Sequence, residues 1–261
     1  MVNEAIILAG GLGTRLRAAV ADLPKCMAPV EGIPFIHFIV SYLRQQGITK
    51  FVFSLGYKNE MVTQYLDKAF EGINKKYIIE SEPLGTGGAI KRAATSAESE
   101  NVLVVNGDTL FNINITNLSD FHELNHSHCT LALKEMKQFS RYGSVELSAA
   151  GIINTFHEKK YCEKGYINGG LYCLNLPSFL EKLLPDKFSF EQDYLEKYTA
   201  DNIFYGVIHQ KYFIDIGIPE DYFRFQQDYK RIALNVDADG PGGEGNNTPG
   251  VFLNSFFNLL H

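Results

Sequence analysis

Residues 5–30 read AIILAGGLGTRLRAAVADLPKCMAPV, a short apolar run that leads directly into a glycine-rich loop. The aliphatic run at 5–9 predicts a β-strand that is buried on both faces. Gly10, Gly11 and Gly13 follow it, and glycine lets the backbone take positive φ angles and approach a phosphate group closely. A strand that ends in such a loop favours an α/β protein with a phosphate-bearing ligand at the end of the strand.

The same order of elements continues through the first half of the chain. Further strands, also expected to be buried on both faces, are predicted at KFVFSL (50–55), KYIIE (76–80) and NVLVVN (101–106). Helices are predicted between them at 34–47, 58–70 and 87–97. The order βαβαβαβ predicts a mostly parallel sheet with right-handed crossovers.

From about residue 129 the pattern changes to strands joined by short turns. These strands are predicted at 129–136, 142–148, 152–159, 165–175, 203–210 and 212–217, with helical stretches at 177–184, 189–198 and 219–234. The predicted fold class is therefore α/β, a Rossmann-like, doubly wound, mostly parallel sheet with a smaller antiparallel or mixed portion.

One domain is expected to span residues 1–235. Its first part, about 1–128, is expected to bind the ligand's phosphates, and its second part, about 129–218, to complete the site. Residues 236–261 combine a glycine- and proline-rich linker with a short apolar tail, and no function is assigned to them.

Composition restricts the function further. The chain has 261 residues, of which 45% are hydrophobic and 21% charged, as in ordinary globular proteins. Lys and Arg total 24 against 30 Asp and Glu, and the resulting charge of −6 leaves no broad basic surface for a nucleic acid. The first residues resemble neither a signal peptide nor a membrane span, and the four cysteines have no metal-binding spacing. We therefore expect a cytoplasmic protein without nucleic-acid or membrane partners.

Two cations accompany the glycine-rich loop. Thr14 and Arg15 follow the glycines, and Lys25 comes ten residues after Arg15. No GKS or GKT follows, so the loop is not a Walker motif, and Arg15-Leu16 stands where the dinucleotide-binding pattern needs its third glycine. A bidentate guanidinium and a compact ammonium suit a polyphosphate better than a nicotinamide cofactor.

Together with five further motifs, this loop resembles the signature of the sugar-1-phosphate nucleotidylyltransferases. The matching segments are GGxGTRL (10–16) with PK (24–25), PLGTGGA (83–89), NGD (106–108), EK (158–159), NGG (168–170) and DIGIPEDY (215–222). The resemblance covers residues 4 to about 232 and implies the nucleotide-diphospho-sugar transferase fold, with a nucleotide-binding part at about 1–128 and a sugar-binding part at about 129–218. It also implies attack by a sugar 1-phosphate on the α-phosphorus of a nucleoside triphosphate, with pyrophosphate leaving.

Asp108 and Asp215 are the expected metal ligands. Each follows an apolar run, and two carboxylates with phosphate oxygens and water suit Mg²⁺. Taken alone, each aspartate also fits a turn or a helix N-cap, but both match the family's metal-holding positions. The resemblance further implies that Arg15 holds the leaving phosphates and that Lys25 bridges the α-phosphate and the sugar phosphate. Arg15, Lys25 and Asp108 are therefore the expected catalytic residues.

The nucleotide is expected to contact residues from four segments: Leu8, Ala9, Gly10, Gly11, Gly13, Thr14 and Arg15; Glu80; Pro83, Gly85 and Thr86; Asn106 and Gly107. Glu80 takes the family's base-reading position, five residues before Gly85. An ionised carboxylate can accept both N–H donors on the edge of guanine, whereas uracil offers one N–H between two carbonyls. Glu80 therefore favours GTP, although it also fits a strand end in solvent.

The sugar 1-phosphate is expected to contact Lys25, Tyr142, Gly143, Glu158, Lys159, Asn168, Gly169 and Glu191. Two of these assignments have structural alternatives. Asn168-Gly169 fits a type I′ hairpin turn, and Glu191 fits the acidic first turn of a helix. Lys160 stands where the family usually has proline after its EK pair.

Within the family, the sequence most resembles the bacterial guanylyltransferases that act on D-glycero-α-D-manno-heptose 1-phosphate. Enzymes that use mannose 1-phosphate and GTP, or UTP and an amino-sugar phosphate, are the alternatives, and a catalytically silent nucleotide sensor is the alternative from another class. The substrates expected are thus GTP and a sugar 1-phosphate, with Mg²⁺ as cofactor, and a homo-oligomer stays open. His122, His126 and His128 are interpreted as a solvated helix end rather than a metal site.

Overall fold

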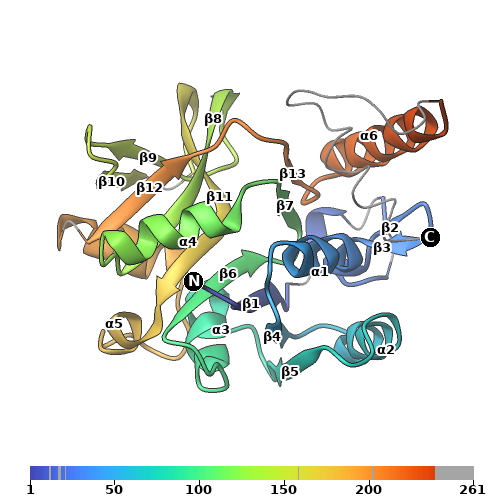
Figure 1. Cartoon of the computed structure of the whole chain (residues 1–261), viewed down its shortest axis with the longest axis horizontal. Helices are drawn as coiled ribbons and strands as arrows, with labels where there is room; N and C mark the ends of the chain where they lie inside the picture. Colours follow the sequence, from blue (N-terminus) through green and yellow to red (C-terminus); the bar gives the residue numbers. More distant parts are fainter. Residues whose placement is uncertain (12, 17–18, 21, 158, 202, 239–261) are drawn as a thin grey trace.

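The computed structural model describes residues 1–238 apart from 12, 17–18, 21, 158 and 202. Within them, nine strands form one sheet at the centre of the protein (Figure 1). Its parallel part has the order β5–β4–β1–β6, from β1 (Glu4–Ala9), β4 (Lys50–Leu55), β5 (Asn74–Ile79) and β6 (Asn101–Asn106). Each neighbouring pair is parallel, which confirms the predicted sheet.

Helices cover both faces of the sheet. The helices of the first half are α1 (Phe35–Gln45), α2 (Asn59–Ala69), α3 (Gly85–Ala94) and α4 (Ile115–Leu124). Because side chains of a strand alternate between faces, Ile7 of β1 joins the apolar cluster of α1, α2 and α4, while Ile6 joins the cluster of α3. The predicted doubly wound α/β class is therefore confirmed.

The second half adds antiparallel strands to the same sheet. β11 (Cys162–Asn175) pairs antiparallel with β6 and with β8 (Cys129–Phe139), and β12 (Phe204–Ile208) pairs parallel with β8. β9 (Ser144–Leu147) pairs with β11 and β10 (Ile153–His157). Two small antiparallel pairs lie outside this sheet: β7 (Thr109–Phe111) with β13 (Phe213–Asp215), and β2 (Pro29–Val30) with β3 (Ile33–Pro34).

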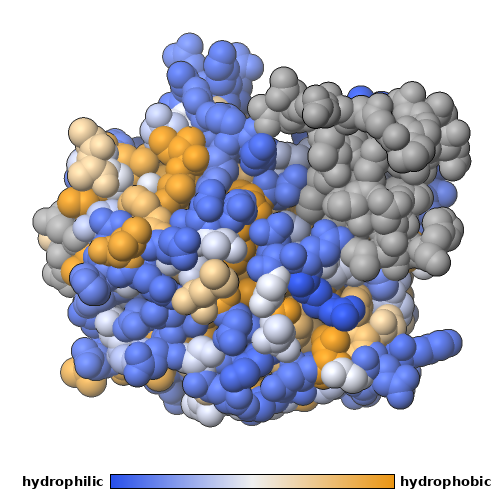
Figure 2. Space-filling view, viewed as in Figure 1, coloured by the Kyte–Doolittle hydropathy of each residue, from blue (hydrophilic) through white to orange (hydrophobic). Residues whose placement is uncertain are grey.

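The remaining helices are distributed over both halves of the chain. These are α5 (Leu176–Leu180), α6 (Pro219–Ala238), the 3₁₀ helices η1 (Thr14–Leu16), η2 (Lys25–Met27) and η4 (Thr199–Asp201), and the π-helix η3 (Phe190–Glu196). Among the described residues, no helix has both the length and the apolar composition needed to cross a membrane. In Figure 2 the visible face is largely hydrophilic, with apolar side chains gathered over β9 and β12.

Several predicted elements differ from the structure. β5 is not buried on both faces, because it is the edge strand of the sheet and Ile79 is 38% exposed. The helix predicted at 177–184 ends at Leu180, where the chain turns and the Lys182 N–H donates to the Phe179 carbonyl at 3.2 Å. The helix predicted at 189–198 is the π-helix η3. α6 continues to Ala238, beyond the start expected for the linker, and residues 239–261 of the predicted tail lie outside the described residues.

The histidine interpretation is wrong for His122, which lies on the buried side of α4 rather than at a solvated helix end. The His122 side chain is 1% exposed and bonds to Thr130 Oγ1 at 2.9 Å and Asn101 Oδ1 at 3.3 Å. Burial lowers the pKa of His122 to about 4, so the ring is neutral at pH 7. Over the described part of the chain, no group of three or more His, Cys, Asp or Glu side chains could hold a metal ion.

Candidate active site

A cleft of about 610 Å³ lies at the carboxyl ends of β1 and β6. Its volume is in the range typical of small-molecule sites. It is lined by these predicted site residues: Leu8, Ala9, Gly10, Gly11, Gly13, Thr14, Arg15, Lys25, Glu80, Pro83, Gly85, Thr86, Asn106, Gly107, Asp108, Tyr142, Gly143, Lys159, Asn168, Gly169, Glu191 and Asp215. Glu158, the remaining predicted site residue, lies outside the described residues. Residues from both halves of the chain thus meet around one cleft.

The glycine-rich loop is shaped by two close approaches. Gly13 has a φ of 59°, and a Cβ there would lie 2.9 Å from Lys25 Cβ. A Cβ at Gly10 would lie 2.7 Å from Glu80 Oε1. A side chain at Gly13 would therefore strain the backbone and displace Lys25, and one at Gly10 would displace the Glu80 carboxylate.

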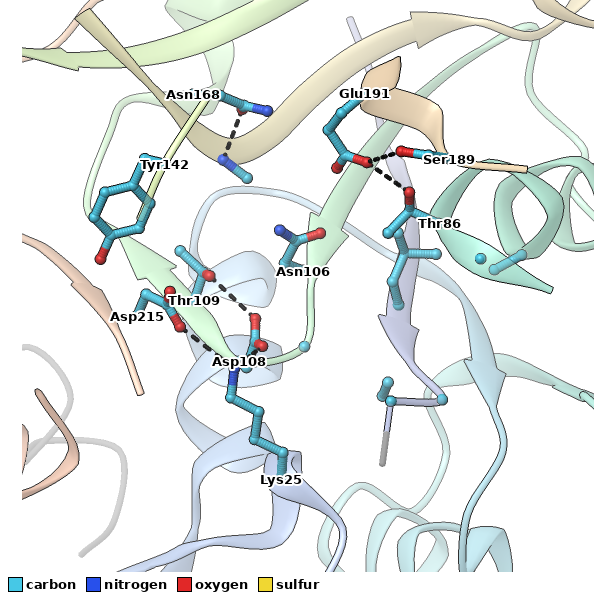
Figure 3. A pocket seen from close by; sticks show the side chains of 18 of the residues that line it. Lys25, Thr86, Asn106, Asp108, Thr109, Tyr142, Asn168, Ser189, Glu191 and Asp215 are labelled. Atoms are coloured by element: carbon cyan, nitrogen blue, oxygen red, sulfur yellow. Dashed lines mark hydrogen bonds and ion pairs between the residues drawn. The ribbon is translucent and has the colours of Figure 1, made fainter. Parts of the chain in front are cut away.

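Lys25 lies between the two aspartates. Its Nζ donates to Asp108 Oδ2 and lies 3.4 Å from Asp215 Oδ1 (Figure 3). The strand pairing explains why the aspartates meet: β13 ends at Asp215, which is opposite Thr109, the residue after Asp108. Two carboxylates that are distant in sequence therefore face one cation position.

Burial and charge repulsion act on this carboxylate pair. Burial, and then the charge of Asp108, raise the pKa of Asp215 above its usual value. The Lys25 ammonium and the Gly217 N–H, which donates to Asp215 Oδ1 at 2.7 Å, oppose this rise. The Lys25 ammonium thus offsets part of the cost of bringing two carboxylates together in a buried place.

A buried cysteine lines the same cleft. Burial raises the pKa of Cys26 to about 12, so the group is a neutral thiol at pH 7. Because the thiolate is the reactive form of cysteine, Cys26 is not equipped to act as a nucleophile.

Glu80 follows β5 and is half-buried rather than fully in solvent. Its Oε1 accepts a hydrogen bond from Ser54 Oγ at 2.8 Å, and its Oε2 accepts one from the Leu84 N–H at 3.3 Å. Ser54 belongs to β4, the neighbouring strand, and is itself buried. The carboxylate is thus held beside Gly10, at the wall of the cleft.

The Asn168-Gly169 pair is not a hairpin turn. Both residues lie inside β11, where Asn168 is opposite Leu133 of β8 and Tyr172 is opposite Leu131. Over this stretch β11 therefore has more residues than β8. The extra residues form a bulge in which the Gly170 N–H donates to Asn168 Oδ1 at 3.0 Å. The bulge explains why the NGG segment faces the cleft.

Glu191 lies on the opposite side of the cleft from Lys25 (Figure 3). It belongs to the first turn of η3, and its Oε2 accepts hydrogen bonds from Thr86 Oγ1 at 2.7 Å and Ser189 Oγ at 3.1 Å. These contacts join η3 to α3, the helix that begins at Gly85. Glu191 therefore lies in the acidic first turn of a helix and also lines the cleft. Its contact with the sugar stays a prediction.

The cleft also contains residues outside the predicted set. These are Cys26, Ala89, Thr109, Arg141, Phe156, Gly170, Tyr172, Ser189 and Phe213. Two of them had a signal in the sequence, because Arg141 precedes Tyr142 and Gly170 ends the NGG motif. Phe156, Tyr172 and Phe213 could not be separated by sequence from ordinary core aromatics.

Residues 4–232 match the nucleotidyl transferase family, and the chain belongs to that family. The fold and cleft are thus those of a nucleotidyltransferase, which confirms the resemblance and the enzyme class expected from the motifs.

Two relatives are similar over most of the chain. The D-glycero-alpha-D-manno-heptose 1-phosphate guanylyltransferase of Aneurinibacillus thermoaerophilus is 50% identical over 225 residues, which cover 86% of this chain and 97% of that protein. The protein of the same name from Campylobacter jejuni is 45% identical over 222 residues, covering 85% and 98%. The crystal structure of HddC from Yersinia pseudotuberculosis complexed with GMP-PN matches with a TM-score of 0.78 at 36% identity, covering 87% of this chain and 100% of that one.

Proposed function

We propose that this protein is a guanylyltransferase that joins GTP and D-glycero-α-D-manno-heptose 1-phosphate to give GDP-heptose and pyrophosphate. The observation that carries the proposal is the meeting of the glycine-rich loop, Lys25, Asp108 and Asp215 in one cleft. The names of the two relatives, and the GMP-PN bound in the similar structure, support a guanosine nucleotide and a heptose 1-phosphate as substrates.

The glycine-rich loop and Arg15 bind the triphosphate. Backbone N–H groups of Gly11 and Gly13 face phosphate oxygens, and the exposed Arg15 guanidinium holds the β- and γ-phosphates. Negative charge grows on these phosphates as they leave as pyrophosphate. Arg15 therefore stabilises the leaving group more strongly in the transition state than in the bound substrate.

Lys25 brings the two reacting phosphates together. An oxygen of the sugar 1-phosphate attacks the α-phosphorus of GTP, and the bond from that phosphorus to the oxygen bridging it to the β-phosphate breaks. The ammonium reduces the repulsion between the two anions and holds them in line. No protein nucleophile takes part, in agreement with the neutral thiol of Cys26.

We also propose that Asp108 and Asp215 hold Mg²⁺. The donor set fits this ion, because two carboxylates lie on one side of the cleft and Mg²⁺ is commonly bound by one or two carboxylates plus substrate phosphates. Lys25 Nζ lies between these carboxylates in this structure, so Mg²⁺ would bind there once the Lys25 ammonium turns to the substrate phosphates. When bound, the ion supplies further neutralisation of phosphate charge. The role proposed for the two aspartates is to hold the ion beside the phosphates that Arg15 and Lys25 contact.

The far side of the cleft receives the sugar. Lys159 faces the sugar phosphate, while Asn168, Tyr142 and Gly143 border the sugar ring. Glu191 accepts hydrogen bonds from hydroxyl groups of the heptose side chain, because its carboxylate reaches the cleft from the end opposite Lys25. The sugar contact expected of Glu158 stays a prediction.

A pyrophosphate-release assay tests this function. The purified protein is supplied with Mg²⁺, each of the four nucleoside triphosphates, and either D-glycero-α-D-manno-heptose 1-phosphate or mannose 1-phosphate. Release is expected to be greatest with GTP and the heptose. Preference for mannose 1-phosphate, or release only with UTP, would contradict the proposed substrates, and no release with any pair would favour a nucleotide sensor.

Guanine selection depends on Glu80 and gives a separate prediction. Inosine triphosphate lacks the exocyclic amine of GTP, so it should lose one hydrogen bond to this carboxylate. Since a hydrogen bond to a charged group contributes about 1.5–3 kcal/mol, kcat/KM should be at least about tenfold lower for inosine triphosphate. Glu80→Gln should remove most of that preference.

Glu82→Gln is the matched control, because Glu82 is exposed and does not line the cleft. It should keep the wild-type ratio of kcat/KM for GTP and inosine triphosphate. An unchanged ratio in Glu80→Gln would show that another group reads the base.

A further inference from the structure

Arg141 lies in the cleft and is paired with a carboxylate from another part of the chain. Its Nη2 donates to Asp221 Oδ2, and Asp221 belongs to the first turn of α6. The Asp221 side chain is 9% exposed and the Arg141 side chain 34%. The ion pair thus joins the segment before β9 to the helix that follows Asp215.

The same guanidinium holds Tyr142. Arg141 Nη2 lies 3.1 Å from the Tyr142 hydroxyl, and its Cζ lies 5.2 Å from the centre of the Tyr142 ring. That ring packs edge-on against Phe213, with centroids 5.7 Å apart. Phe213 begins β13, so the Tyr142 ring is held between the Arg141 guanidinium and this strand.

The other end of this segment is also fixed. The Gly143 carbonyl accepts a hydrogen bond from the Asn168 N–H at 2.9 Å. Residues 141–143 are therefore tied to α6 at one end and to the bulge of β11 at the other. Both ties lie beside the part of the cleft assigned to the sugar, and neither involves the glycine-rich loop.

We propose that the Arg141–Asp221 ion pair is a latch that positions Tyr142 and Gly143 for the sugar 1-phosphate, which makes Arg141 and Asp221 positioning residues for nucleotidyl transfer. The inference rests on the proposed function, because it needs a sugar 1-phosphate on this side of the cleft. The latch acts on the acceptor substrate and leaves binding of the nucleotide unchanged.

Asp221→Asn and Arg141→Gln test the latch by the effect on each substrate separately. In both variants, kcat/KM for the sugar 1-phosphate should fall about 10- to 100-fold, because small misplacements of a substrate-positioning group cost this much. KM for the nucleotide should change by less than about threefold. The double variant should be little worse than either single one, since both remove the same interaction.

Arg224→Gln is the matched control. Arg224 Nη2 binds the other oxygen of the same carboxylate, Asp221 Oδ1, at 3.0 Å, but the Arg224 side chain is 54% exposed and does not line the cleft. This variant should keep wild-type kinetics for both substrates. If Arg224→Gln matched Arg141→Gln, the carboxylate would act through α6 alone and the latch would be overturned.

Thermal unfolding of each variant separates positioning from loss of fold. A sugar-specific effect in variants that unfold within a few degrees of wild type supports the latch. Wild-type kcat/KM for the sugar in Asp221→Asn, or a parallel loss for both substrates, would overturn it. The kinetics are measured with whichever nucleotide and sugar 1-phosphate give turnover, so failure of GTP or heptose contradicts the proposed function without affecting this test.

Discussion

Lys25→Ala is expected to lower kcat for nucleotidyl transfer by about a hundredfold or more while the protein stays folded. Of the described basic side chains that line the cleft, Lys25 is the least exposed, at 12%, and its ammonium faces both aspartates. Without it, two phosphate anions have to meet beside Asp108 and Asp215. Loss of one preorganised electrostatic contact of this kind typically costs 10²–10³ in turnover.

Pyrophosphate release measured at saturating substrates, together with circular dichroism, checks this result. Lys164→Ala is a suitable control, because Lys164 forms an exposed ion pair with Glu135 at 2.7 Å outside the cleft. It should leave kcat within about threefold of wild type. A Lys25→Ala enzyme of similar activity would remove Lys25 from the proposed mechanism.

Asp215→Asn is expected to lower activity without lowering stability. It should lower kcat by about a hundredfold, because one of two carboxylates proposed to hold Mg²⁺ is lost. It should not lower the free energy of unfolding at pH 7 without divalent metal. Burial and Asp108 raise the pKa of Asp215, which means that its charged form is unfavourable in the fold, and asparagine removes that charge.

Urea unfolding in the presence of a chelator, and pyrophosphate release with Mg²⁺, measure the two effects. Asp186→Asn is the control, since its side chain is 94% exposed and pairs with Lys91 at the surface. It should change neither quantity appreciably. An Asp215→Asn protein that is clearly less stable than wild type, or that keeps full activity, would contradict the assigned role.

Local sequence patterns predicted the parts of the fold that local interactions decide. The run at 5–9 and the glycines after it are contiguous, so the strand, the tight loop and the cleft wall could be expected together. The apolar pattern of 101–106 placed Asp108 at a strand end, where parallel sheets bind ligands, but its metal-holding role was predicted from its match to the family motif. Asp215 was also predicted from its match to the family motif, because its spacing in the sequence does not indicate that it lies near Asp108.

Features that depend on tertiary packing could not be predicted. The burial of His122 requires Thr130 and Asn101 to lie on either side of it, and no periodic pattern indicates that. The bulge at Asn168 is set by register against β8, so two residues read in isolation suggested a hairpin turn. The pairing of Arg141 with Asp221 joins positions that are distant in sequence, and only the folded chain brings them together.

The strand β11 has a consequence for how the enzyme closes on its substrates. Its last residues pair with β6 next to the nucleotide, and its first residues pair with β8 and β9 next to the sugar. β11 pairs with β6 over Leu171–Asn175 and with β8 on both sides of the bulge between Asn168 and Tyr172. These backbone hydrogen bonds tie both parts of the cleft floor to one sheet. Because residues 141–143 are also held at both ends, by Asp221 and by Asn168, we expect the proposed nucleotide and sugar sites to keep a fixed separation when substrates bind.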